Sequence, residues 1–234
     1  MTPSSIPVTA TSIVDAIAAD LRTRMFSGEL TADMPLTETD MATAYNVARP
    51  TVKAAIERLV AEGLLVRGLH KTARVAALGP AAVSDIYHSR AYLESEILRR
   101  LALMRLVPAE AVAANAEIGR LSEGTPTDLI EPDIRFHLSL IDAVGSDRMS
   151  KMYRSLMSEV RLCMNRVQSL GLLAPGLIHA EHEQILRLIA AGKGDAAAAL
   201  LDDHLGRARE RLIKALGGEA GPQADAPTDL LARP

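Results

Sequence analysis

The spacing of apolar residues changes twice along this chain, and those two changes limit the folds open to it. Helical spacing holds as far as Gly63, two short extended pieces follow, LLVRGL and ARVAAL, and helical spacing resumes after Gly79-Pro80. The extended pieces are joined through His70-Lys71-Thr72 and are typical of a small β-hairpin. The sequence therefore predicts a mostly α fold, with three helices and a hairpin first and helices only thereafter.

Four segments are expected from these boundaries. Residues 1–9 form a flexible N-terminus, residues 10–78 a small domain, residues 79–216 an all-helical bundle, and residues 217–234, rich in Gly, Ala and Pro, a disordered tail. The bundle is predicted to hold six helices at about Ala81–Met104, Pro108–Leu121, Thr127–Val144, Asp147–Leu170, Pro175–Ala191 and Asp195–Leu216.

Composition excludes several classes of protein. The chain has no apolar run near about 18 residues, and its start, MTPSSIPVTATS, lacks the basic and apolar regions of a signal peptide, so we expect a cytoplasmic protein with no membrane span. Cys163 is the sole cysteine and lies in a helical pattern, which indicates a buried, inert thiol. The net charge of −3 gives no global argument for nucleic acid, but residues 46–78 carry six basic and only two acidic side chains.

Those basic residues fall on the third predicted helix and on the hairpin. The first three helices are expected at about Ile13–Ser27, Glu38–Tyr45 and Pro50–Glu62, and such helices followed by a hairpin describe a winged helix-turn-helix. In that fold the third helix enters the major groove and the hairpin lies near phosphate or the minor groove. The DNA-contact candidates are Arg49, Thr51, Lys53, Arg58, His70, Lys71 and Arg74. The alternative is a small helical domain with a solvated basic side.

The stretch from Leu36 to Val75, with MATAYNVARPTVKAAIERLVAEGLL at its centre, resembles the DNA-binding half of the GntR family of bacterial transcription regulators. The resemblance implies operator DNA as a partner. The family usually has Ser-Arg-Thr-Pro-Val-Arg-Glu-Ala-Leu where this chain has ARPTVKAAI, so Arg49 is kept and Lys53 replaces the second arginine. Lysine is a point charge rather than a bidentate fork, so we expect Lys53 to contact phosphate, or guanine less selectively.

Four side chains of the bundle have spacings that suit a metal site. Asp133 and His137 lie one helical turn apart, so they can face a metal, a ligand or only each other. Lys193, the centre of a Gly-Lys-Gly turn, is midway between His182 and His204, which places these two at the same height in an antiparallel helical hairpin. Imidazole nitrogens and a carboxylate suit divalent zinc, nickel, manganese or iron. Such a centre would keep a positive charge and attract an anion.

The pieces DIYHSRAYLE, DIRFHLSLIDAVGSD and EHEQILRLIAAGKGDAAAALLDDH resemble FCD, the ligand-sensing domain of the FadR subfamily, in its metal-binding form. The six-helix length is similar to that of the shorter, VanR-like branch. The resemblance implies that Asp133, His137, His182 and His204 hold a divalent transition metal, with zinc favoured and nickel, manganese or iron as alternatives.

The resemblance also implies a small carboxylate effector. Arg90 falls where family members place an arginine, and a guanidinium beside a metal would bind a carboxylate through two hydrogen bonds. The alternative is an ion pair between Arg90 and Glu94, one helical turn away. Arg161 and Asn165 are weaker candidates for effector contacts.

These parts together predict a transcription regulator, a repressor, that binds a palindromic operator as a homodimer and responds to a small organic acid at the metal. No enzymatic activity is expected. One alternative is a metal-dependent hydrolase built on the same Asp and three His, although no carboxylate near the four ligands stands out as its general base. The other alternative is a regulator whose metal is purely structural.

Overall fold

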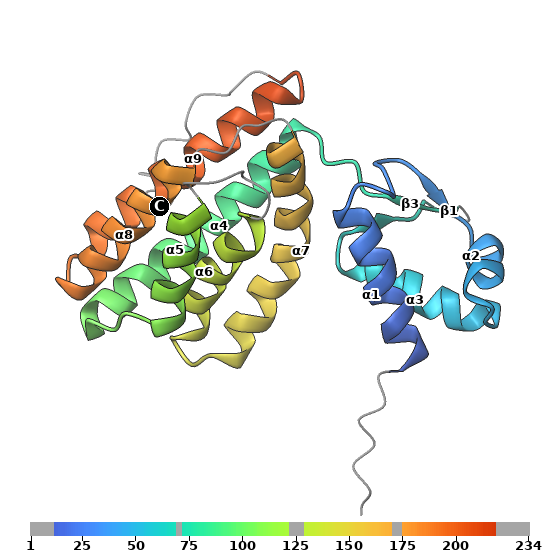
Figure 1. Cartoon of the computed structure of the whole chain (residues 1–234), viewed down its shortest axis with the longest axis horizontal. Helices are drawn as coiled ribbons and strands as arrows, with labels where there is room; N and C mark the ends of the chain where they lie inside the picture. Colours follow the sequence, from blue (N-terminus) through green and yellow to red (C-terminus); the bar gives the residue numbers. More distant parts are fainter. Residues whose placement is uncertain (1–11, 69–71, 122–128, 170–174, 219–234) are drawn as a thin grey trace, which may run out of the picture.

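The computed structural model describes residues 12–68, 72–121, 129–169 and 175–218, without the side chains of residues 166–169. Within these ranges the chain forms nine α-helices and three short strands, and the helices gather into a small group around the strands and a larger bundle (Figure 1). This arrangement confirms the expected mostly α fold, a winged helix-turn-helix followed by a six-helix bundle. Within the described residues, no helix combines the length and hydropathy needed to cross a bilayer.

The N-terminal part contains three helices and a small antiparallel sheet. Its elements are α1 (Ile13–Phe26), β1 (Pro35–Leu36), α2 (Glu38–Tyr45), α3 (Arg49–Ala61), β2 (Leu65–Val66) and β3 (Ala73–Val75). The strands lie in the order β1-β3-β2, with Leu36 opposite Ala73 and Leu65 opposite Val75. The hairpin of β2 and β3 was expected, whereas β1 was missed because two residues are too few to show an alternating pattern.

Local capping explains where the first helices begin. The Ser12 hydroxyl accepts a hydrogen bond from the Asp15 amide, and the Thr37 hydroxyl accepts one from the Asp40 amide at 3.0 Å. Pro50 occupies the first turn of α3, where its missing amide costs no hydrogen bond. The inward face of α3 is fully buried and consists of Val52, Ala55, Ile56 and Leu59.

The C-terminal part is a bundle with its own hydrophobic core. Its helices are α4 (Pro80–Met104), α5 (Ala109–Leu121), α6 (Ile130–Asp142), α7 (Asp147–Ser169), α8 (Pro175–Ala190) and α9 (Gly194–Ala215). The start predicted for the third bundle helix, at Thr127, lies outside the described residues, and α6 as described begins at Ile130. The long helices α4 and α9 pack along each other, and α6 and α8 lie beside them.

Helix α7 is the bundle helix that meets the N-terminal part (Figure 1). Leu162 packs against the N-terminal core, and the Arg161 guanidinium lies 5.1 Å from the centre of the Phe26 ring in α1. On other faces of the same helix, Tyr153 and Val160 are fully buried in the bundle core. Helix α7 therefore contacts both the bundle interior and the N-terminal part of the chain.

Candidate functional site

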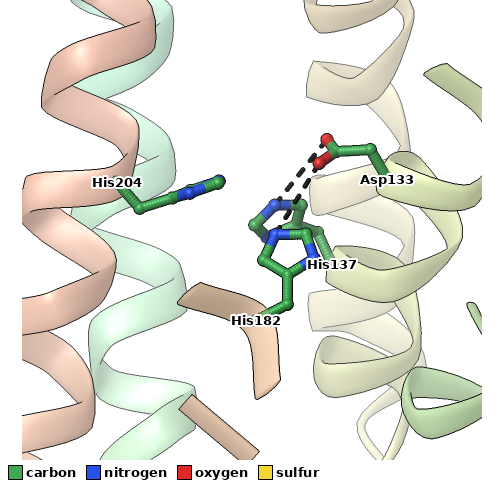
Figure 2. A group of neighbouring side chains, drawn as sticks. All are labelled: Asp133, His137, His182 and His204. Carbon is green, nitrogen blue, oxygen red and sulfur yellow. Dashed lines mark ion pairs between the residues drawn. The ribbon is translucent and has the colours of Figure 1, made fainter. Parts of the chain in front are cut away.

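The four predicted metal ligands come together in the interior of the bundle. Asp133 and His137 extend from α6, His182 from α8 and His204 from α9, and each offers a ligand atom within 4.8 Å of the others (Figure 2). All four side chains are buried. The His182 and His204 rings are 4.9 Å apart between their centres, as the hairpin argument predicted. The structure therefore brings together side chains that are up to 71 positions apart in the sequence.

The donor atoms of this cluster fit a divalent transition metal. Nε2 of His137 and both ring nitrogens of His182 are buried without a hydrogen-bond partner among the described residues. The Asp133 oxygens lie 3.8 Å from His137 Nε2 and 3.7 Å from His182 Nε2, too far for hydrogen bonds. A buried polar atom without a partner costs about 1–3 kcal/mol, and metal coordination would remove that cost. One carboxylate and three imidazoles suit zinc, nickel, manganese and iron alike.

The electrostatics of His182 agree with the role of a ligand. Burial, together with the neighbouring His204 and His137, lowers the pKa of His182 well below its usual value. Its ring is therefore neutral at physiological pH, and a neutral imidazole is the form that binds a metal. The ring is held in place by stacking on Phe136, with centres 3.7 Å apart and planes 3° from parallel.

Two glutamates lie against the cluster, which the sequence analysis did not predict. Glu94 of α4 accepts hydrogen bonds from His137 Nδ1 at 2.5 Å, Arg90 Nε at 2.9 Å and the Tyr153 hydroxyl at 2.5 Å. Burial opposes ionisation of Glu94, but its interaction with His137, the charge of Arg90 and the hydrogen bond from Tyr153 outweigh burial and hold its pKa well below the usual range. Glu94 had been recognised only as a partner of Arg90, because its contact with His137 spans 43 positions.

The second glutamate, Glu181, precedes a ligand in the sequence but contacts a different one. Its carboxylate accepts a hydrogen bond from His204 Nδ1 at 2.8 Å and pairs with Arg207. Burial works against ionisation, yet hydrogen bonding to His204 and the charge of Arg207 lower the pKa of Glu181. The two glutamates are carboxylates beside the cluster that the sequence analysis did not single out, and each accepts a hydrogen bond from a cluster histidine.

A narrow cavity of about 50 Å³ opens beside the cluster. The ionisable side chains of Arg90, Asp133, Glu181, His204, Arg207 and Arg211 are among those that line it. Arg90 pairs with Glu94, as one of its two sequence interpretations expected, and it also lines this cavity; its contact with an effector stays a prediction. Two of the predicted ligands, Asp133 and His204, therefore line the same cavity as three arginines.

The other two effector candidates lie elsewhere. Arg161 donates to Glu131 Oε2 at 3.0 Å and lines a cavity between α1 and α7, while Asn165 lines a third cavity that includes residues 75–78. Both are on the face of α7 that turns toward the N-terminal part, whereas Met164 is the α7 residue that lines the cavity beside the cluster. The structure does not bring Arg161 and Asn165 to the cluster, because a helix presents neighbouring residues on different faces.

The N-terminal half of α3 is the exposed basic surface. Arg49 and Lys53 are exposed one turn apart, and Thr51 between them is partly buried. The Arg49 side chain is 66% exposed, and its nearest carboxylate, on Glu38, is 4.0 Å away. Arg49 and Lys53 can therefore reach a DNA backbone without breaking a close ion pair.

The remaining DNA candidates are placed differently. Arg58 pairs with Asp15 of α1 and, at 3.4 Å, with Glu62, so its guanidinium is held against the protein. Arg74 of β3 is exposed and donates to the Asp33 carbonyl at 2.8 Å. His70 and Lys71 lie outside the described residues.

Comparisons with known proteins agree with both parts of the chain. Residues 13–75 match the family model described as bacterial regulatory proteins, gntR family, and residues 85–207 match the FCD domain. The Nta operon transcriptional regulator of Aminobacter aminovorans is 25% identical over 189 residues, which is 78% of this chain and 86% of that protein.

Solved structures give the same result. A GntR transcriptional regulator from Rhodococcus sp. RHA1 is similar with a TM-score of 0.71 and 26% identity, over 88% of this chain and 99% of that one. The E. coli protein McbR/YncC shares the fold with a TM-score of 0.66 at 18% identity, over 89% and 98% of the two chains. With a gntR match over its winged helix-turn-helix and an FCD match over most of its bundle, this chain belongs to the GntR family of transcriptional regulators with an FCD domain.

Proposed function

We propose that this regulator is a repressor that binds a palindromic operator as a homodimer, and that a small carboxylate bound at a metal centre changes its operator affinity. The metal is a divalent transition ion, zinc in the first place, held by Asp133, His137, His182 and His204. Arg49, Thr51, Lys53 and Arg74, with His70 and Lys71 of the hairpin, contact the DNA.

One observation carries the metal and effector parts of this proposal. Four buried side chains from three helices meet, and imidazole nitrogens of His137 and His182 have no hydrogen-bond partner among the described residues. Two of the four, Asp133 and His204, also line a cavity whose wall includes arginines. A divalent ion with one carboxylate and three neutral imidazoles keeps a net charge of about +1. Arg90 and Arg207 line the cavity but each is paired with a glutamate, so the charge of the metal centre itself is what favours an anionic ligand there.

The regulatory step is a shift between two arrangements of the DNA-reading helices in the dimer. Each protomer offers one α3, and a two-fold axis matches two such helices to a palindromic site. A 10- to 100-fold loss of operator affinity requires about 1.4 to 2.7 kcal/mol of differential effector binding. Helix α7, which contacts both the bundle core and α1, is placed to transmit that difference.

The test is thermal unfolding of zinc-loaded protein against a panel of small carboxylates, each with and without a chelator. A ligand at about 100 times its dissociation constant adds about 2.7 kcal/mol, which raises the melting temperature of a chain of this size by about 5–10 °C. We expect this stabilisation from one class of carboxylate and expect the chelator to abolish it. If the chelator lowers the melting temperature but no carboxylate raises it, the metal is structural and the effector part of the proposal fails.

A second measurement addresses the DNA part. Selection of bound sequences from a random duplex library should return a palindrome, and the selected duplex should bind more tightly than random duplex at physiological salt. Equal affinity for selected and random duplexes would contradict the proposal of an operator-specific repressor.

A further inference from the structure

Two of the three cluster histidines each contact a glutamate on the side that faces away from the cluster. His137 directs Nδ1 to Glu94 at 2.5 Å, and His204 directs Nδ1 to Glu181 at 2.8 Å. The first pair is almost completely buried, with side-chain exposures of 0% and 1%, and the second pair is 8% and 12% exposed. The two pairs join four different helices, because Glu94 lies in α4, His137 in α6, Glu181 in α8 and His204 in α9.

These contacts determine the tautomers of the two rings. An ionised carboxylate can only accept hydrogen bonds, so Nδ1 of each histidine carries the proton and donates it. A neutral ring with its proton on Nδ1 has its lone pair on Nε2, which is the free donor atom for a metal. In His137 that Nε2 is buried without a partner among the described residues. The glutamates therefore select the tautomer that leaves Nε2 open on the cluster side.

Each glutamate is itself fixed from its far side. Arg90 and Tyr153 bind the second oxygen of Glu94, and Arg207 binds the second oxygen of Glu181. Arg90 and Arg207 also line the cavity beside the cluster. His137 and His204 are thus each the inner end of a His–Glu–Arg chain whose arginine lines the cavity.

The third histidine provides an internal comparison. Neither nitrogen of His182 has a hydrogen-bond partner among the described residues, and its ring is oriented by stacking on Phe136. A stacked ring is fixed in its plane, but stacking does not choose which nitrogen holds the proton. Any tautomer preference confined to His137 and His204 therefore belongs to the glutamates rather than to burial in general.

We propose that Glu94 and Glu181 are positioning residues for the metal centre, which fix His137 and His204 as Nδ1–H tautomers and so present both Nε2 atoms to the ion. The inference rests on the metal part of the proposed function and adds two residues that do not touch the ion. Outer carboxylates of this kind change metal affinity by about 10- to 100-fold when they are lost.

The experiment has two readouts on the full-length chain. The first is the zinc dissociation constant, measured by competition with a chromophoric chelator, for the wild type, Glu181→Leu, Glu94→Gln and Glu183→Gln. The last is the matched control, because Glu183 lies in α8 beside His182 but is exposed and pairs with Arg187 at 3.4 Å. We expect zinc binding to weaken by about 10- to 100-fold in Glu181→Leu, to weaken less in Glu94→Gln, which keeps an acceptor oxygen, and to stay unchanged in the control.

The second readout is the tautomer of each ring, from long-range proton–nitrogen spectra of histidine-labelled, metal-free protein at alkaline pH. We expect Nδ1–H rings for His137 and His204 in the wild type, and loss of that form for His204 alone in Glu181→Leu. A glutamate that served only packing would lower stability without changing the tautomer. If Glu94→Gln fails to fold because Arg90 loses its charged partner, Glu181→Leu decides the question.

The outcomes separate this inference from the proposal that it rests on. A wild type that binds no zinc refutes the metal centre, while the metal-free spectra still test the tautomers. A wild type that binds zinc, with variants that bind it equally well and keep the same ring tautomers, overturns the positioning role and leaves the metal centre standing.

Discussion

Glu159 of α7 lies directly against Gly63, two residues after helix α3 ends at Ala61. A Cβ atom placed on Gly63 would come 2.7 Å from Glu159 Cδ, and Gly63 has a backbone φ of +72°, where glycine is favoured. Burial, together with the neighbouring Asp85, raises the pKa of Glu159. The bundle therefore touches the chain just after α3 at a position where an added Cβ atom would require the Glu159 side chain to move.

Gly63→Ala should destabilise the protein more than the matched change Gly28→Ala. Both glycines have positive φ, +72° and +79°, and an alanine in that conformation costs about 1–2 kcal/mol. Only Gly63 has a neighbour, because nothing lies within 4 Å of a Cβ at Gly28. Urea unfolding should show the larger loss for Gly63→Ala, and Glu159→Ala in the same chain should remove the excess. Equal losses at the two glycines would show that the contact with Glu159 has no energetic effect.

The exposed half of α3 should govern the salt dependence of DNA binding. Lys53→Ala and Arg49→Ala should each lower the slope of log affinity against log salt by about 1 on a random duplex, since each removes one phosphate contact. Arg58→Ala is the control on the same helix, because its guanidinium pairs with Asp15 and Glu62. We expect Arg58→Ala to leave the slope unchanged and to cost about 0–1 kcal/mol of stability. A slope change for Arg58→Ala equal to that for Lys53→Ala would place Arg58 on the DNA.

The sequence predicted both pairs of the cluster because each pair is related by simple helix geometry. Asp133 and His137 share a face through their four-residue spacing, and His182 and His204 are equidistant from the turn at Lys193. Both relations hold in the structure, where the four side chains meet. Fold class followed in the same way from the change of apolar spacing.

Other features depend on contacts that leave no periodic signal. The hydrogen bond of Glu94 to His137 joins α4 to α6, and Glu181 contacts His204 rather than its sequence neighbour. Arg161 matched the pattern of a pocket residue but turns toward α1, because the packing of α7 against the N-terminal part decides which face is inward. Such relations arise only after helices have packed, so one helix at a time does not reveal them.

Metal-free protein should lose stability as the pH falls below about 6.5, the pKa of histidine in an unfolded chain. Burial first, and then the charges of His204, His137, Arg90 and His179, lower the pKa of His182 in the folded state; the Asp133 carboxylate at 3.7 Å does not reverse the shift. The unfolded chain therefore binds a proton that the folded chain does not. This contribution is complete above pH about 6.5 and declines below it by up to about 1.4 kcal/mol per pH unit.

The measurement is urea unfolding of chelated protein across this pH range, with His182→Leu as the comparison. The variant lacks the titrating ring and should show a shallower fall in the free energy of unfolding. Zinc-loaded wild type should hold its stability to lower pH than chelated wild type, because the ion competes with protons for the same nitrogens. Parallel curves for chelated wild type and His182→Leu would contradict the lowered pKa of His182.

Cys163 should react with thiol reagents far more slowly in the folded protein than in the unfolded chain. It is the sole cysteine and is 2% exposed in α7, and burial raises the pKa of its thiol to about 12. Only the thiolate attacks a disulfide reagent, so at pH 8 the shift alone slows the reaction by on the order of 1,000-fold relative to a free cysteine. The rate of colour release from an aromatic disulfide reagent, with and without denaturant, measures this ratio. Rapid, stoichiometric labelling of the folded protein would mean that α7 separates readily from its neighbours, and a helix that loose could not carry a signal from the cluster to α1.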